Sequence, residues 1–316
     1  MNNSQSAMDA QSTDGILVID KPAGWTSHDV VARVRKLLKT RRVGHTGTLD
    51  PFATGVLIVC VNRATRLVQF LVGDDKEYLA TVRLGFATDT GDLTGQPISP
   101  VSDARGITSE MVQDALAHFR GRIKQIPPMY SAKKVGGVKL YELARQGKEI
   151  ERKPVEVEIK KLEVAESLDH VDRTEAPTKD FCLQVACSSG TYIRVLAEEI
   201  GARLGIGAHL VALRRMRIGC CDLACGVTLE QLAELVETGR IEQTMIPMVE
   251  AVNLDELEVD QDERRNLLHG RPVRRPGRWV SGALAKLCDH NRLLIAIAEY
   301  DAEGQIWRPR TVLSTQ

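Results

Sequence analysis

The N-terminal part of the chain alternates continuous apolar runs with runs whose apolar residues recur at helical spacing. The apolar run at 15–20 (GILVID) is closed by the turn residues KPAG, which predicts a buried strand. Ser27 is a typical N-cap, and the following valines and leucines recur three and four residues apart, which predicts a helix to Lys39. A second buried strand is predicted over 56–61 (VLIVCV).

The same order of elements continues after the second strand. Asn62 can cap a helix that runs to about Leu71, and the alternation at 77–84 (EYLATVRL) predicts a half-buried strand. A long polar turn region at 85–97 precedes a helix predicted near 109–119. The middle of the chain therefore combines strands and helices around one core.

Further strands and helices follow, and the character changes near residue 250. We predict strands at 154–164, 181–187 and 209–219 and helices at 191–204 and 227–239. We expect an exposed charged connection at 166–180. After an acidic stretch, short basic turns alternate with strands at 293–301 and 305–313, which predicts a small β-rich C-terminal domain.

The composition fits a globular protein with a large core. Of 316 residues, 43% are hydrophobic and 27% charged, and no run approaches the ~20 apolar residues of a membrane span. Residues 1–14 are polar, without an apolar core or a basic start, so we interpret them as a frayed tail and expect a cytoplasmic protein.

The seven cysteines lack paired C-x-x-C spacing, and most lie in apolar runs. We therefore expect reduced thiols that behave as small hydrophobic groups. The cluster CCDLAC at 220–225 is compatible with half of a metal site, but no second half with matching spacing exists in the sequence.

Lys plus Arg and Asp plus Glu both number 42, so the formal net charge is zero. Three strips are nevertheless basic, at 36–42 (KLLKTRR), 214–217 (RRMR) and 271–278 (RPVRRPGR), whereas 250–263 is acidic. Basic strips on a neutral chain can bind a polyanion. The alternative is that they are ordinary solvated faces.

The segment 44–55 (GHTGTLDPFATG) carries one carboxylate, Asp50, among three glycines and a proline. These residues break both helix and strand periodicity, so we predict an irregular loop, a common place for functional side chains. The following proline favours an extended conformation at Asp50 and fixes the direction of its side chain. The alternative is a turn residue that bonds its own backbone.

A second segment, SSGTYIRVLAEEIG at 188–201, places Tyr192 and Arg194 where a strand passes into a helix. An arginine here can pair with Asp50, keep it ionised and lower its pKa. Tyr192 and Tyr78 can each stack on a planar base or simply fill the core. His45 is either a proton shuttle, a polar wedge or an ordinary loop residue.

No phosphate-binding glycine loop, dinucleotide fingerprint, zinc-protease helix or serine elbow is present in the sequence. A loop carboxylate without a visible cofactor motif points to a nucleophilic or proton-abstracting aspartate acting on an activated substrate. No cofactor and no metal are predicted.

Five segments in the right order resemble the bacterial TruB-type tRNA pseudouridine-55 synthases. The resemblance covers about residues 15–250 and is carried by GHTGTLDPFATGVL, DKPAGWTSHDVV, KEYLATVRLGFATDTGD, PPMYSAKKVGGVKLYELARQG and SSGTYIRVLAEEIGARLGIGAHLVALRRMRIG. The family isomerises a uridine in the T-loop of tRNA without metal, cofactor or guide RNA. The sequence leaves the oligomeric state open, and monomer is the default that the family implies. The resemblance thus implies tRNA, bound through its T-arm, as the partner.

The resemblance also implies the fold. It is of the α+β class: a pseudouridine synthase fold with a mixed, largely antiparallel sheet flanked by helices, followed by a small PUA-like domain. The implied division is a tail at 1–14, a catalytic domain at 15–250 and an RNA-binding domain at 251–316. Residues 127–147 correspond to the thumb-like segment that closes over RNA, although their composition also fits a plain surface hairpin.

Catalytic roles follow from the positions that match the family's motifs. Asp50 matches the catalytic aspartate and Arg194 the arginine that pairs with it. Tyr78 matches the tyrosine that stacks on the target base and assists proton removal at C5. The family flips its target nucleotide out of the loop, because neither C1′ nor C5 can be reached within the stack.

Four more residues match binding or supporting positions. His45 matches the histidine that takes up the space vacated by the flipped nucleotide. Tyr192 and Leu213 match positions that line the base pocket. Lys21 and Asp92 match motif residues near the site, with a role that is partly structural.

Two other functions share these motifs. One is an RNA-folding factor that chaperones tRNA through the same groove, with catalysis incidental. The other is the guide-RNA-dependent relative of the family, which shares the Asp50 motif and the run LIVCVNRATRLV. The block RLGFATDTGD and the lack of long basic tails speak against guide dependence.

Overall fold

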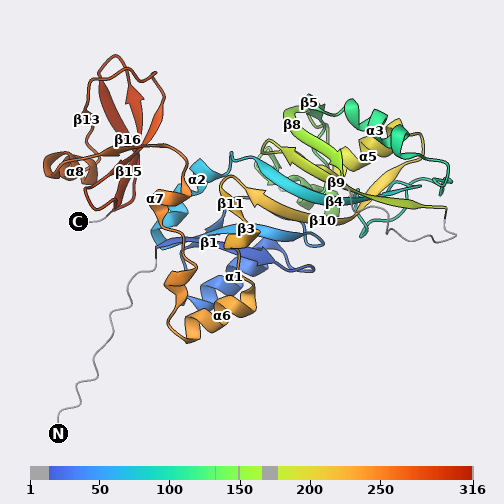
Figure 1. The fold of residues 1–316 in the computed structure, drawn as a ribbon, viewed down its shortest axis with the longest axis horizontal. Coiled ribbons are helices and arrows are strands. Elements are labelled where there is room, and N and C mark those ends of the chain that lie inside the picture. The colour runs from blue at the N-terminus through green and yellow to red at the C-terminus, as the bar shows by residue number, and fades with distance from the viewer. Residues whose placement is uncertain (1–13, 132, 149, 166–176, 315–316) are drawn as a thin grey trace, which may run out of the picture.

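A long mixed sheet runs through the N-terminal three quarters of the chain (Figure 1). The computed structural model describes residues 14–131, 133–148, 150–165 and 177–314. The strand order is β1-β3-β10-β4-β9-β8-β5, with β2 on β3 and β11 on β10, and all neighbours are antiparallel except β3 and β10. The strands are β1 (Gly15–Lys21), β2 (Val43–His45), β3 (Thr54–Val61), β4 (Lys76–Leu84), β5 (Gly121–Gln125), β8 (Val155–Val164), β9 (Lys179–Cys187), β10 (Ala208–Ile218) and β11 (Cys221–Asp222).

Helices cover the sheet at both ends. At one end α1 and α6 lie against β1 and β3, and at the other α3 and α5 lie against the strands from β10 to β8 (Figure 1). The predicted α+β class with a largely antiparallel sheet is confirmed. The helices are α1 (Ser27–Leu37), η1 (Asn62–Leu67), α2 (Val68–Leu71), α3 (Ser109–Ala117), α4 (Leu140–Arg145), α5 (Ile193–Arg203), η3 (Leu223–Cys225), α6 (Leu229–Glu237), η4 (Ile241–Gln243), α7 (Met248–Ala251) and α8 (Gln261–Leu268).

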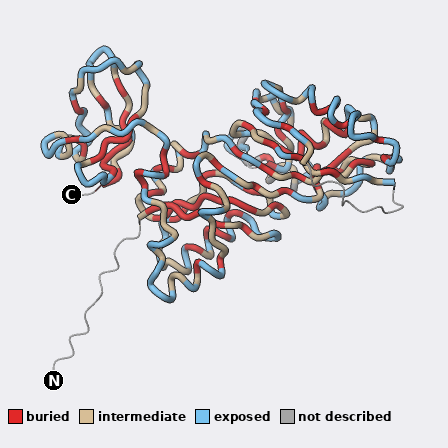
Figure 2. The backbone as a smooth tube through the Cα atoms, viewed as in Figure 1, coloured by how far each residue is buried: buried red, intermediate tan, exposed pale blue. Residues whose placement is uncertain are grey.

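The unbroken apolar runs of β1 and β3 arise because both faces of these strands are buried, as the red strands in Figure 2 show. Leu17 and Leu57 point to the face covered by α1 and α6. Ile16 and Ile58, on the opposite face, pack against η1, α2 and the C-terminal domain. The predicted strands at 15–20 and 56–61 are therefore confirmed, each extended by one or two residues.

The first helix begins one residue earlier than predicted. Its N-cap is Thr26, whose side chain accepts a hydrogen bond from the Asp29 amide while the Asp29 carboxylate accepts one from the Thr26 amide. Ser27, which we predicted as the cap, is the first helical residue and is buried. The helix also ends at Leu37, before the predicted Lys39.

The segment after β3 is not the capped α-helix that we predicted. Asn62 has a φ of +53° and opens a 3₁₀ turn without a side-chain cap, and a single α-turn over 68–71 follows. Asparagine is one of the few residues that tolerate this left-handed conformation. The Asn62 side chain instead accepts a hydrogen bond from the Thr40 hydroxyl at 2.6 Å.

Residues 127–147 form a short hairpin and a helix. β6 (Lys134–Val135) and β7 (Val138–Lys139) are joined by Gly136 and Gly137, both with positive φ, as a two-residue hairpin turn requires. Both expected readings of this segment, hairpin and thumb, remain compatible with that structure.

Two predicted irregular segments fall largely outside the described residues. The predicted tail at 1–14 is described only at Asp14, which directly precedes β1. Asp14 is ion-paired with Arg63 of η1, so this residue is not frayed. The predicted connection at 166–180 is outside the description over 166–176, and its last two residues already belong to β9.

The C-terminal domain has its own sheet and its own core. The sheet has the order β12-β14-β15-β16-β13 and surrounds Trp307 and Tyr300. It docks on the first sheet through a shared apolar cluster and through hydrogen bonds from Arg66 and Gln69 to β16. Its strands are β12 (Asp255–Glu258), β13 (Val273–Arg274), β14 (Leu284–Cys288), β15 (Leu294–Asp301) and β16 (Ile306–Val312).

No helix in the described part of the chain is both long and apolar enough to cross a membrane.

Candidate active site

The loop that carries Asp50 lies between β2 and β3 and is shorter than predicted. Residues 44–45 belong to β2 and residues 54–55 to β3, so the irregular part is 46–53. The sequence analysis missed β2 because three residues with a glycine at the centre carry too little periodicity to be recognised. Both ends of the loop are thus anchored in the sheet.

Buried polar groups hold the loop on both sides of Asp50. Ser27 accepts a hydrogen bond from the Leu49 amide at 2.9 Å and donates to the Leu49 carbonyl at 3.2 Å. The Pro51 carbonyl accepts hydrogen bonds from the Gly24 amide at 2.8 Å and from the Lys21 ammonium at 3.3 Å. The residues before and after Asp50 are therefore fixed, which orients its carboxylate without regular secondary structure.

Arg194 reaches Asp50 from the first turn of α5. Its Nε lies 2.9 Å from Asp50 Oδ2, and its Nη2 donates to Oδ1 at 3.3 Å. The guanidinium also donates to the carbonyls of Thr90 and Tyr130, each at 2.7 Å. The predicted contact between Arg194 and Asp50 is present, and the fork geometry makes it a charge-assisted pair.

Asp92 lies behind Arg194. Its Oδ2 is 3.7 Å from Arg194 Nη1, and its Oδ1 accepts hydrogen bonds from the hydroxyls of Thr90 and Thr94. Asp92 is buried, so it supports the arginine and does not face solvent.

The pKa of Asp50 is raised, contrary to our prediction of a lowered value. Burial of the carboxylate raises the pKa most, Arg194 lowers it, and the Asp92 charge raises it again. The prediction considered the ion pair alone and omitted both the removal of the carboxylate from water and the second aspartate. Nearby, burial lowers the pKa of the Lys21 ammonium to about 8.

Asp50 lies at the wall of a pocket of about 400 Å³. This volume falls within the range of small-molecule and cofactor sites. Ser131 and Lys133 of the thumb-like segment belong to the lining of the pocket. Tyr78, Tyr192 and Leu213 line it together with Asp50 and Arg194. Five of the eight predicted site residues are therefore brought together.

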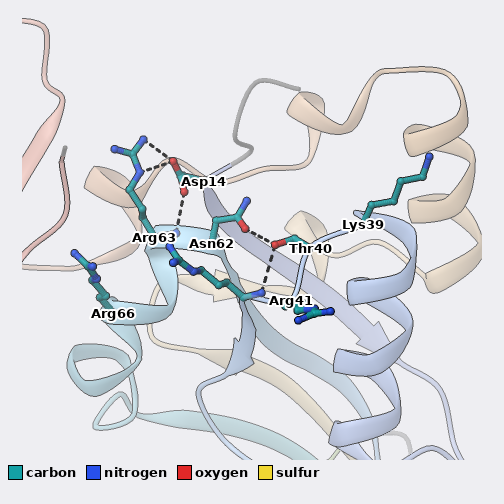
Figure 3. A pocket seen from close by; sticks show the side chains of 8 residues that line it. Asp14, Lys39, Thr40, Arg41, Asn62, Arg63 and Arg66 are labelled. Atoms are coloured by element: carbon teal, nitrogen blue, oxygen red, sulfur yellow. Dashed lines mark hydrogen bonds and ion pairs between the residues drawn. The ribbon is translucent and has the colours of Figure 1, made fainter. Parts of the chain in front are cut away.

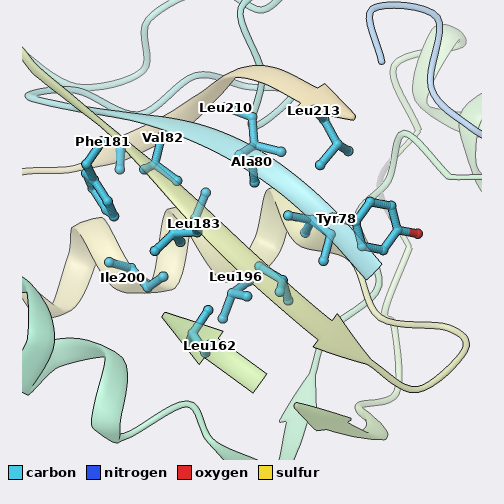
Figure 4. Packing of buried hydrophobic residues seen from close by; sticks show 14 of the residues in the cluster. Tyr78, Ala80, Val82, Leu162, Phe181, Leu183, Leu196, Ile200, Leu210 and Leu213 are labelled. Atoms are coloured by element: carbon cyan, nitrogen blue, oxygen red, sulfur yellow. The ribbon is translucent and has the colours of Figure 1, made fainter. Parts of the chain in front are cut away.

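The apolar part of the pocket is the end of a hydrophobic cluster. Figure 4 shows Tyr78, on β4, at one end of this cluster, near Leu213 on β10. Only 7% of Tyr78 and 6% of Leu213 is exposed, so their surfaces facing the pocket rest on a packed core. Burial raises the pKa of the Tyr78 phenol and that of the Tyr192 phenol.

His45, Lys21 and Asp92 do not line the pocket. His45 ends β2, and its ring lies edge-on to that of His28 with the centroids 5.5 Å apart. Lys21 is fully buried and donates to the carbonyls of Pro22 and Trp25 as well as Pro51. Their positions are those of residues that support or flank the site.

Three buried residues near the pocket were missed in the sequence analysis. Gln125 exchanges two hydrogen bonds with the Tyr192 backbone, at 2.9 and 3.2 Å. Lys76 and Arg215 both line the pocket. A signal for Arg215 existed, because residues two apart on a strand share a face and Leu213 had been placed in the pocket.

The interpretation of the basic segment RRMR at 214–217 as a surface strip is largely wrong. Arg215 is 1% exposed, because β10 turns it into the protein. Arg214 is paired with Asp20 at 2.7 Å, and Arg217 lies near Glu77 and Asp222. This strip therefore presents little free positive charge to a polyanion.

The basic strip at 36–42, in contrast, borders a second pocket of about 580 Å³ (Figure 3). The pocket lies beside η1, whose Arg66 donates to the Val312 carbonyl of the C-terminal domain. The cations that line it are Lys39, Arg41, Arg42, Arg63 and Arg66.

The cysteine cluster at 220–225 follows β10. Cys220 and Cys225 are exposed and Cys221 is buried, and all seven thiols are free. In the described part of the chain, no three His, Cys, Asp or Glu side chains are grouped so that they could hold a metal ion.

Gly55, at the end of the Asp50 loop, supports a direct test of how tightly the loop is packed. Its φ is +102°, and an added Cβ would lie 2.2 Å from the carbonyl oxygen of Arg215. We expect Gly55→Ala to lower the free energy of unfolding by about 2–5 kcal/mol, from backbone strain plus overpacking, measured by urea unfolding.

Gly73→Ala is the matched control, because an added Cβ at Gly73 meets no atom within 4 Å. It should change the free energy of unfolding by less than about 1 kcal/mol. Equal effects of the two substitutions would contradict the close approach of Gly55 to Arg215.

Three family models match successive parts of the chain. Residues 35–193 match the N-terminal domain of the TruB family pseudouridylate synthases. Residues 194–256 match the C-terminal domain of tRNA pseudouridylate synthase B, and residues 256–313 match the C-terminal region of pseudouridine synthase II TruB.

Individual relatives agree with these models. A tRNA pseudouridine synthase B of Streptomyces avermitilis is 41% identical over 93% of this chain and 96% of its own length. One of Geobacter sulfurreducens is 47% identical over 76% of this chain and 75% of its own length.

The fold is shared with solved structures of the Cbf5 type. In a Cbf5-Nop10-Gar1 complex, the matching chain is 27% identical with a TM-score of 0.73, covering 96% of this chain and 86% of that one. A chain of an H/ACA ribonucleoprotein bound to a substrate RNA is 25% identical with a TM-score of 0.72, at the same coverage.

Proposed function

The chain belongs to the TruB family of pseudouridylate synthases, and on that premise we propose that it converts uridine 55 in the T-loop of tRNA to pseudouridine. Its enzymatic class is that of a tRNA pseudouridine synthase, as in relatives 41–47% identical to it. The observation that carries the assignment of the site is the Asp50 carboxylate, paired with Arg194 at the wall of a pocket that holds Tyr78 and Leu213.

The reaction needs a fixed carboxylate and an enclosed place for a base. The bond from C1′ to N1 breaks, the uracil turns within the site, C5 bonds to C1′, and the C5 proton leaves while N1 gains one. Asp50 is the catalytic nucleophile in this proposal, ionised and aimed by Arg194. Attack on C1′, addition to the base and abstraction of a sugar proton all require the carboxylate in nearly the same place.

The remaining lining residues suit a uracil ring. Tyr78 supplies an aromatic face for stacking and a phenol near C5, and Leu213 and Tyr192 form the walls. The Asp50 carboxylate lies within the same cavity, so a uridine must leave its base stack to reach it. His45, beside the loop, is the proposed occupant of the space that the nucleotide vacates.

The domain assignment follows the family. Residues 15–250 form the catalytic domain, residues 251–316 a PUA-like RNA-binding domain, and residues 127–147 a thumb that closes over RNA. Two observations support the thumb: Ser131 and Lys133 line the Asp50 pocket, and the Tyr130 carbonyl accepts a hydrogen bond from Arg194. Thumb position and the orientation of Arg194 are therefore connected.

The basic pocket beside η1 is the proposed second contact with tRNA. Five cations surround it, and Arg41 and Arg42 are exposed. Phosphate contacts of this kind position an RNA without reading its sequence. On a chain of zero net charge, binding would depend on such a cluster and have a modest salt slope.

Neutralising the exposed pair should weaken tRNA binding without touching the chemistry. For Arg41→Gln combined with Arg42→Gln, we expect a tRNA Kd raised about tenfold and a salt slope smaller by roughly 1.4–1.8, because two phosphate contacts are lost. The single-turnover rate at saturating tRNA should stay within about threefold. Filter binding across a range of salt concentrations measures the Kd and the salt slope.

The matched control replaces two exposed arginines elsewhere, Arg105→Gln with Arg240→Gln. Both pair with nearby carboxylates and lie outside the two pockets. This control should leave the Kd and the salt slope unchanged. An equal loss in the control would mean that the basic pocket has no particular share in tRNA binding.

The protein is proposed to act as a cytoplasmic monomer without a guide RNA. The relatives named tRNA pseudouridine synthase B are 41–47% identical to this chain, whereas the matching chains of the Cbf5-Nop10-Gar1 complex and the H/ACA ribonucleoprotein are 25–27% identical to it. Base flipping can be tested by placing 2-aminopurine next to position 55. Fluorescence should rise on binding to the Asp50→Asn protein, and no change would contradict extrusion of the nucleotide.

A further inference from the structure

Both ends of the Asp50 loop meet on one side chain, that of Arg215. Its Nη2 and Nη1 donate to the carbonyls of Gly47 and Thr48, at 3.2 and 3.4 Å, before Asp50. Its Nε donates to the Val56 carbonyl at 2.7 Å, after the loop. The start and end of the loop are therefore tied through a single guanidinium.

The backbone of Arg215 takes part as well. Gly55 pairs with Arg215 across the one parallel pairing of the main sheet, between β3 and β10. The close approach described above leaves no room for a side chain at Gly55. These contacts hold the end of the loop directly against β10.

Arg215 carries an unusual charge for its surroundings. It is 1% exposed, and no carboxylate of the described residues lies within ion-pair distance of it. Main-chain carbonyls solvate the guanidinium, but burying a charge without a carboxylate partner still costs folding free energy. Because Arg215 lines the pocket, we look for the effect of its charge on the groups there.

Tyr78, on the adjacent strand β4, is the direct neighbour of Arg215. The two residues are direct partners in the antiparallel pairing of β10 and β4, so their side chains leave the sheet on the same side. Burial raises the pKa of the Tyr78 phenol, and the neighbouring guanidinium of Arg215 acts in the opposite direction.

We propose that Arg215 is a positioning residue of the reaction, which holds the Asp50 loop and the Tyr78 side chain in fixed relation and stabilises the Tyr78 phenolate that accepts the C5 proton. This inference rests on the roles proposed above for Asp50 and Tyr78. In the step concerned, the Tyr78 phenol first loses its proton to solvent, which the charge of Arg215 favours against the effect of burial. The C5–H bond then breaks, its electron pair re-forms the C5=C6 double bond, and the phenolate oxygen takes the proton, which returns Tyr78 to the phenol.

The test compares Arg215→Lys, which keeps the charge but loses the fork, with wild type in single-turnover reactions. The tRNA transcripts carry either hydrogen or deuterium at C5 of uridine. We expect Arg215→Lys to slow the reaction about 100-fold through misplacement of the reacting groups, with tRNA affinity within about threefold. We also expect its C5 isotope effect to exceed that of wild type, because proton removal becomes rate-limiting.

Tyr78→Phe separates a role through Tyr78 from a merely structural one. Adding Arg215→Lys to Tyr78→Phe should lower the rate further but leave the isotope effect unchanged, since the phenol is gone. An unchanged rate in Arg215→Lys, or a loss of rate with the isotope effect of wild type, would overturn the proposal. Arg217→Gln, on the same strand but outside the pocket, is the control and should match wild type in both quantities.

A second measurement covers the case in which Arg215→Lys fails to fold. In protein labelled with ¹⁵N-arginine, the buried guanidinium of Arg215 should give slowly exchanging signals that shift on Tyr78→Phe. Signals that exchange fast, or that ignore the substitution, would overturn the proposal without any Arg215 variant. A wild-type protein that forms no pseudouridine would instead refute the proposed function, so the two failures are distinguishable.

Discussion

Replacement of Asp50 by asparagine should abolish pseudouridine formation while leaving the fold and tRNA binding intact. We expect the single-turnover rate to fall by at least about 10⁴-fold, a rise in the barrier of roughly 5 kcal/mol, because asparagine cannot act as the nucleophile. Rates are measured on an unmodified tRNA transcript at saturating enzyme.

The stability of Asp50→Asn follows from the raised pKa of Asp50. A carboxyl whose pKa is raised by burial destabilises the folded state once it ionises, so the neutral amide removes this cost at neutral pH. Arg194 keeps its bonds to the carbonyls of Thr90 and Tyr130, and its charge is still compensated by the Asp92 carboxylate, 3.7 Å away. The melting temperature of Asp50→Asn should therefore not fall. If the variant unfolds, its loss of activity has a structural cause and does not support a catalytic role for Asp50.

Asp103→Asn is the control for Asp50→Asn. Asp103 is also bonded to an arginine, Arg105, but it is exposed and outside the pocket. It should retain wild-type turnover. In cells, full rescue of a strain lacking the gene by the Asp50→Asn protein would favour the RNA-folding role over catalysis as the biological function.

Replacement of Arg194 has the second largest expected effect, and it acts on pH dependence. Arg194 lowers the pKa of Asp50 against the effect of burial, so Arg194→Met should raise that pKa further. Asp50 must be ionised to attack, and activity therefore disappears on the acid side as pH falls through its pKa. The acid limb of the rate profile should move to higher pH.

The magnitude at neutral pH comes mainly from lost orientation. We expect a fall of roughly 100-fold or more in Arg194→Met. Removing one partner of a buried pair costs about 3–5 kcal/mol, and Arg194 is only 5% exposed, so unfolding must be measured beside activity. Arg194→Lys, which keeps the charge, should shift the acid limb less than Arg194→Met. An acid limb that stays in place in both would contradict the role of the ion pair.

The architecture was largely accessible from sequence because burial imposes regular periods. The strands at 15–20, 77–84 and 154–164 each had an apolar run or strict alternation, and each is present within two residues. What failed was decided by local backbone chemistry. Thr26 and Ser27 are both good caps, and only the reciprocal bonds with Asp29 select Thr26. The φ of +53° at Asn62 has no periodic signature.

The contact between Asp50 and Arg194, 144 positions apart, was expected from motifs, but its electrostatic consequence was not. The net direction of the pKa shift depends on burial and on Asp92, and both require coordinates. Arg215 was overlooked for a different reason, because its spacing from Leu213 was available in the sequence. A run of three arginines in four residues looks like a surface strip until the alternation of β10 turns one of them inward.

The most direct test incubates the purified protein alone with an unmodified tRNA transcript and maps pseudouridine by position, in parallel with Asp50→Asn. The account predicts modification of the single T-loop uridine at position 55 by the wild-type protein and none by Asp50→Asn. Modification elsewhere, a requirement for a guide RNA, or substantial activity in Asp50→Asn would contradict it.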